Sequence, residues 1–141
     1  MLLNNMIRQK TGIVLESLRL RIKDGIAAAA NLGFQGIQID APQRDIAPEN
    51  LSQTGRRELK RIIDLNRLCL CALGGELGVG FNNHNEFDFI IKRTKEIIDL
   101  ALDLQTGIVT VQIGSIPTDN SSTHWHAVNT ALSEIGLHAG N

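Results

Sequence analysis

Two junctions in this chain share one pattern, in which a helix ends, a glycine turns the backbone and a buried strand begins. The first leads from an alanine-rich helix through Gly33 into 36–40, and the second leads from Leu104 through Gly107 into 108–113. Glycine suits such a junction because the residue after a helix commonly adopts a positive φ, which costs little without a Cβ. Helix-to-strand units in series predict a parallel sheet with helical crossovers.

The hydrophobic pattern predicts four strand–helix units in an α/β fold. Ser52 is expected to cap the second helix, and the third helix has apolar residues at i, i+3, i+4 and i+7 spacing. Two architectures remain open, namely a curved sheet with helices on its outer face only and a small doubly wound sheet with helices on both faces. Strands are expected at 11–15, 36–40, 68–73 and 108–113, and helices at about 22–32, 52–66, 87–101 and from 122 onward.

The composition fits a soluble globular domain or part of one. The chain has 141 residues, of which 43% are hydrophobic and 21% charged, with a net charge of −1. That balance gives no reason to expect nucleic acid or an anionic membrane as a partner. The N-terminus lacks the features of an export signal, and no apolar run approaches the ~20 residues that span a bilayer. We expect a cytoplasmic protein.

The cysteines Cys69 and Cys71 lie two residues apart in a predicted strand. That spacing puts both side chains on the same face. We expect two buried thiols and no disulfide between them.

Three segments of the chain resemble the sugar phosphate isomerase/epimerase group of the xylose isomerase-like TIM barrels. They are the strand at 11–15, the junction at 32–39 and the stretch at 100–114. The resemblance covers nearly the whole chain, but only the first four βα units of a fold that needs eight strands and about 250 residues. It implies that 1–141 is a single partial domain, a (βα)4 half of a TIM barrel with parallel strands and outer helices.

The resemblance also bears on chemistry. Members of that group typically hold a divalent metal on acidic residues and a histidine at the ends of strands five to eight, with two glutamates moving the proton. None of those positions falls within this chain, so we expect no cofactor here and no activity alone, although a full-length member would carry a metal. The related apurinic endonucleases use histidines after strands three and four. The matching positions here are Gln112 and 71–73, which contain no histidine, so the metal ligands expected of a DNA-repair endonuclease are missing as well.

Polar residues at the carboxyl ends of the strands are the candidate binding residues, because barrel active sites lie at that face. They are Gln38, Asp40, Glu76 and Gln112, with Glu16 on the same rim. The family often has a glutamate where Gln38 stands, and an amide can still hydrogen-bond a sugar hydroxyl. We expect a small carbohydrate as ligand; the alternative is that these side chains only solvate the rim.

Other polar clusters are expected to be structural. His124 and His126 point apart on a helix and cannot share an ion, while Trp125 between them is expected to be buried. His138 has no polar partner nearby in sequence. The basic residues of 56–61 alternate with acidic ones on a helix, which predicts a solvated outer face.

An isolated half-barrel has two unpaired edge strands. We also expect its inner face to be apolar, at Ile13, Ile37 and Leu70 or Cys71, and to need a cover. The chain is therefore expected to form a homodimer or to be completed by a missing C-terminal half. A second functional hypothesis follows, namely a non-catalytic half-barrel that binds or assembles with itself or another chain.

Overall fold

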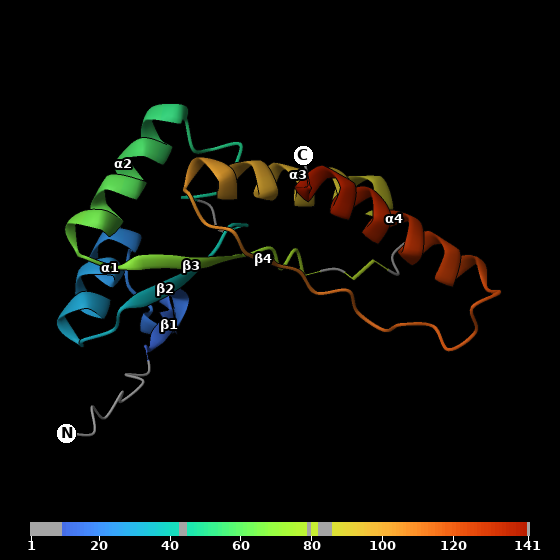
Figure 1. Ribbon diagram of the computed structural model, residues 1–141, viewed down its shortest axis with the longest axis horizontal. Coiled ribbons are helices and arrows are strands. Elements are labelled where there is room, and N and C mark those ends of the chain that lie inside the picture. The colour runs from blue at the N-terminus through green and yellow to red at the C-terminus, as the bar shows by residue number, and fades with distance from the viewer. Residues whose placement is uncertain (1–9, 43–44, 79, 82–85, 141) are drawn as a thin grey trace, which may run out of the picture.

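The computed structural model describes residues 10–42, 45–78, 80–81 and 86–140. Four strands form one parallel sheet in the order β1-β2-β3-β4, and an α-helix follows each strand (Figure 1). A short 3-10 turn, η1, lies between β1 and the first helix. The elements are β1 Gly12–Val14, η1 Leu15–Leu18, α1 Ile22–Asn31, β2 Gly36–Asp40, α2 Gln53–Leu65, β3 Cys69–Gly74, α3 Phe87–Asp103, β4 Val109–Thr110 and α4 Thr123–Ala139.

Helices α1, α2 and α3 bury a single face of the sheet. Ile37 and Ile39 of β2 are fully buried there, and Leu73 of β3 packs in the same core. The helical side of this core is Ile26, Ala29, Leu59, Ile63, Ile97, Leu100, Ala101 and Leu104. The prediction of four parallel βα units is confirmed, and the doubly wound alternative is wrong because no helix in the described part of the chain covers the opposite face.

The face opposite the helices, here called the inner face, is polar and glycine-rich instead of apolar. Ile37 and Leu70 are buried on the helix side, and Ile13 packs against the same core, so the prediction that they form an uncovered apolar face is wrong. Cys69 and Cys71 are exposed free thiols, which also contradicts the prediction that they are buried. The inner face consists of Gly12, Val14, Gly36, Gln38, Asp40, Cys69, Cys71, Ala72 and Gly74.

Strand ends differ from the predicted ones at the two edges of the sheet. β4 was expected over 108–113 but pairs with β3 at only two positions, Leu73 with Val109 and Gly74 with Thr110. β1 ends at Val14, where the backbone tightens into η1. Both are end strands of the sheet, so each has a neighbour on one side only among the described residues.

The caps of the helices follow the predicted chemistry in part. Ser52 accepts a hydrogen bond from the backbone N–H of Gly55, and Ser122 accepts one from that of Trp125. Gly33 has φ +86°, as its junction requires. At the second junction the residue with positive φ is Gln105, at +58°, and not Gly107. The turn was therefore placed two residues too late.

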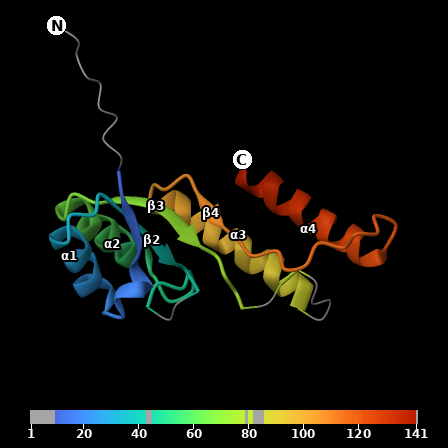
Figure 2. The same ribbon diagram turned by 90° about the horizontal axis from the view of Figure 1, so that it is seen from below.

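Helix α4 packs on α3 and extends away from β1 and β2 (Figures 1 and 2). Its buried residues Val128, Ala131 and Ile135 form a second core with α3. Trp125 is only half-buried, in edge-to-face contact with the His126 ring. His138, expected to lack a partner, pairs with Asp99 of α3 at 2.8 Å. No helix in the described part of the chain has the length and apolarity needed to cross a bilayer.

Candidate functional site

Gln38 and Asp40 converge on one point at the carboxyl end of β2. Both side chains are half-buried on the inner face, and Asp40 lies opposite Gly74 of β3 in the strand register. Asp40 Oδ1 occupies the space that a Cβ on Gly74 would need, and Gln38 Nε2 lies 3.4 Å from the same point. Only glycine at position 74 leaves room for this carboxylate, so β3 shapes the site although it supplies no polar side chain there.

Glu16 holds the backbone of the same site from η1. Its Oε1 accepts a hydrogen bond of 3.0 Å from the backbone N–H of Asp40, whereas Oε2 is buried and has no hydrogen-bond partner among the described residues. Burial raises the pKa of Glu16, the Asp40 N–H opposes that shift, and the nearby Asp40 charge adds to it. Glu16 was recognised from sequence as a rim residue, but its contact with Asp40 joins segments 24 residues apart and has no local signal.

The structure brings together only half of the predicted site. Glu76 and Gln112 are both exposed, and no hydrogen bond in the described regions joins either of them to Gln38 or Asp40. They follow β3 and β4, so they lie toward the same end of the sheet without contributing to the cluster over Gly74. Their role in binding stays a prediction.

The described residues do not fit a divalent metal. Within the ranges that the structure describes, no three His, Cys, Asp or Glu side chains are grouped as ligands. The carboxylates nearest each other at the sheet edge are those of Glu16 and Asp40, and one Glu16 oxygen already accepts a backbone N–H. No cluster of three protein ligands therefore supports a metal at this edge in the described ranges, and no chemistry is assigned to a metal here.

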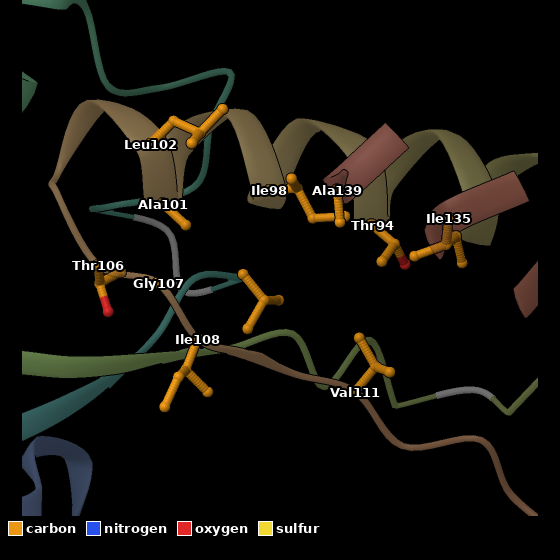
Figure 3. Close-up of a pocket in the computed structure, with 11 residues that line it drawn as sticks. Thr94, Ile98, Ala101, Leu102, Thr106, Gly107, Ile108, Val111, Ile135 and Ala139 are labelled. Carbon is orange, nitrogen blue, oxygen red and sulfur yellow. The ribbon is translucent and has the colours of Figure 1, made fainter. Parts of the chain in front are cut away.

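A second concave feature lies at the β4 edge of the sheet. An apolar pocket of about 400 Å³ opens between α3, β4 and the end of α4, with Ile98, Ile108, Val111 and Ile135 among its walls (Figure 3). Ile108 is 56% exposed, which is high for a large apolar side chain beside a strand. Within the described residues β4 pairs with β3 alone, so the pocket adjoins a free strand edge.

Parallel strands, helices on one face and a polar cluster at the carboxyl ends define this chain as a half-barrel of four βα units. The family profile described as Xylose isomerase-like TIM barrel matches residues 26–141. The chain therefore belongs to the xylose isomerase-like TIM barrel family, as the sequence resemblance predicted, and its fold is a (βα)4 half of that barrel.

Solved structures with this fold are similar over most of the chain. A xylose isomerase domain protein from Planctomyces limnophilus has a TM-score of 0.71 at 19% identity, covering 80% of this chain and 43% of that one. The probable 3-DHS dehydratase AsbF of Bacillus anthracis, involved in petrobactin synthesis, scores 0.67 at 18% identity, with 94% and 49% covered. A xylose isomerase-like TIM barrel/4-hydroxyphenylpyruvate dioxygenase fusion protein scores 0.66 at 19% identity, with 94% and 20% covered.

This chain thus spans less than half the length of each of these structures. At such identities the likeness concerns the fold alone. A comparison with curated proteins finds no match.

Proposed function

We propose that this chain is the substrate-positioning half of a sugar phosphate isomerase or epimerase, and that it binds a small carbohydrate at the carboxyl end of β2. The observation that carries the proposal is the convergence of the Gln38 amide and the Asp40 carboxylate over Gly74. A carboxylate accepts hydrogen bonds from hydroxyl groups, and an amide both donates and accepts them. Neighbouring hydroxyls of a sugar match that pair.

The proposed role of Gln38 and Asp40 is binding, without catalysis by these residues alone. Proton transfer on a sugar needs a base within hydrogen-bond reach of the carbon-bound proton and a means of stabilising the enolate that forms. Asp40 and Glu16 are the carboxylates at the cluster, and no grouped metal ligands accompany them in the described ranges. We propose that the acid/base and metal chemistry of the family resides in the other half of a complete barrel.

Nuclear magnetic resonance tests the binding site. We expect a keto-hexose phosphate, titrated into ¹⁵N-labelled protein, to shift the Gln38 side-chain amide and the backbone amides of Asp40 and Gly74. Asp40→Asn should abolish these shifts. Asp64→Asn makes the same chemical change on the exposed side of α2 and should leave them intact. Equal shifts in the Asp40→Asn variant, or shifts confined to other elements, would contradict the proposed site.

Deuterium exchange tests the limit on activity. The isolated chain should not exchange the α-proton of the keto-hexose phosphate with deuterated solvent above background. Exchange that disappears in Asp40→Ala would show that this half carries catalytic chemistry and would overturn the division of roles.

The second candidate function is assembly, and the free edge of β4 favours it. That edge lies beside the apolar pocket, where Leu102 and Ile108 are 67% and 56% exposed. A parallel strand from another chain would pair with β4 and bury these side chains. Two copies that pair β1 with β4 twice would close eight strands by an isologous contact. Light scattering coupled to size exclusion tests this function, because it distinguishes a dimer from a monomer.

A further inference from the structure

The two thiols of the chain lie side by side on the inner face, away from the Gln38–Asp40 cluster. Cys69 and Cys71 are both exposed and free. The register between β2 and β3 shifts after Ile37, so Cys71 has no direct partner on β2. Such a bulge leaves one residue out of the ladder and re-aims its side chain. Cys71 Sγ donates to the backbone oxygen of Cys69 at 3.6 Å, which places its sulfur over Cys69.

The neighbouring strand makes room for this arrangement. Cys71 Sγ occupies the space that a Cβ on Gly36 would need. Partial burial raises the pKa of Cys71, and the charge of Cys69 and a hydrogen bond with its thiol raise it further. The geometry rests on the contact of Cys71 Sγ with the backbone oxygen of Cys69 and on the exposure of both thiols on one face of β3.

Two cationic residues line the same pocket as the thiol pair. The pocket has a volume of about 450 Å³, and its lining includes Cys69, Cys71, Lys10 and Arg67. Two thiolates that bind a monovalent cation form a complex of net charge −1, which these two cations would stabilise. A neutral or cationic complex would gain nothing from them.

We propose that Cys69 and Cys71 form a two-sulfur site for a soft monovalent metal ion, with Cu(I) as the matching ion. Soft thiolate ligands favour Cu(I), Zn²⁺ and Fe–S clusters, and of these Cu(I) is stable with only two sulfur ligands. Structural zinc sites need four ligands, and no third His, Cys, Asp or Glu is grouped with the pair in the described chain. Binding replaces two S–H bonds by two S–Cu bonds and releases two protons, with no change in oxidation state.

An anaerobic competition experiment tests the site. Cu(I) is supplied as its complex with a coloured chelator, and the loss of colour is followed as the reduced protein is added. We expect the chain to remove one ion per molecule. Cys69→Ser and Cys71→Ser should each lose this ability, whereas His126→Ala, which removes an exposed ligand on α4, should retain it. X-ray absorption of the loaded protein should show two sulfur neighbours and no nitrogen.

Three results would overturn the site. They are retention of Cu(I) by either serine variant, failure of the native chain to compete, and one ion per two chains with a doubled mass. Circular dichroism of each variant separates loss of ligand from loss of fold, and Cys69→Ala provides a second variant at the more exposed end of the strand. Since both protons must leave, the competition should weaken as the pH falls, while Arg67→Ala should weaken it at every pH.

Discussion

Arg56 is the side chain whose removal tests the packing of this half-barrel most directly. From α2 its guanidinium donates to the backbone oxygens of Pro48 and Leu51, both at 3.0 Å, and to the carboxylate of Asp103 at 2.6 Å. Its side chain is only 16% exposed. Arg56 thus ties the segment after β2 to the end of α3. The prediction of a wholly solvated basic helix face is wrong at this position.

The expected loss for Arg56→Ala follows from those three contacts. Asp103 is 35% exposed, so its ion pair contributes only about 0–1 kcal/mol. The two carbonyl contacts carry most of the effect, because a hydrogen bond to a charged group contributes about 1.5–3 kcal/mol. Pro48 is buried, whereas Leu51 is half-buried and regains water. We expect a loss of about 2–4 kcal/mol and a Tm lower by roughly 5–15 °C.

Urea and thermal unfolding followed by circular dichroism measure this loss, with Arg57→Ala as the matched control. Arg57 is the next residue of α2 and is exposed, so its removal should change stability by less than about 0.5 kcal/mol. Arg56→Lys retains the charge without the planar fork of donors and should lie closer to the alanine variant than to the native chain. Equal stability of the two alanine variants, or full stability of Arg56→Lys, would refute the reasoning.

Three further predictions concern the site and the edges. Gly74→Ala displaces the Asp40 carboxylate, so it should abolish carbohydrate-induced shifts and lower stability by about 1 kcal/mol, whereas Gly107→Ala, which meets open space, should do neither. Because the pKa of Glu16 is raised, its contribution to stability is present below its ordinary value of 4.5 and is lost as pH rises through the folded pKa. The urea midpoint should therefore fall as pH rises through that range in the native chain and should change less with pH in Glu16→Gln. Light scattering should give twice the chain mass, and a sharp monomer peak would contradict assembly.

Short-range sequence signals predicted those helix ends that depend on interactions between residues a few positions apart. Ser52 and Ser122 cap their helices because the hydroxyl of an extended N-cap serine can reach the N–H three residues later. Arg67 and Gln105 adopt positive φ just after α2 and α3, at +56° and +58°. Arginine and glutamine do not signal a left-handed turn, so the sequence predicted the second turn at Gly107 and not at Gln105.

The inner face shows where strand periodicity was sufficient and where it failed. In β2 the alternation of Ile37, Gln38, Ile39 and Asp40 already separates an apolar face from a polar one. The amphipathic helices must cover the apolar face, so this alternation puts Ile37 on the helix side, and the prediction that placed it on the inner face did not use that constraint. In β3 the bulge at Cys71 changes the phase, so Leu70 and Leu73 both face the helices although they lie three residues apart, while both thiols are exposed on the inner face.

Because the inner face is polar, its burial is not needed to keep apolar surface away from water. A face made of glycines, Gln38, Asp40 and two thiols can remain in contact with water, so its burial supplies little hydrophobic driving force. Within the described residues the outer edge of β4 has no partner strand, and association that buried this edge and the adjacent pocket would stabilise the assembly. A partner strand at that edge would leave the carboxyl end of β2 open to a ligand. Closure of the sheet and binding at Asp40 are therefore compatible functions of one half-barrel.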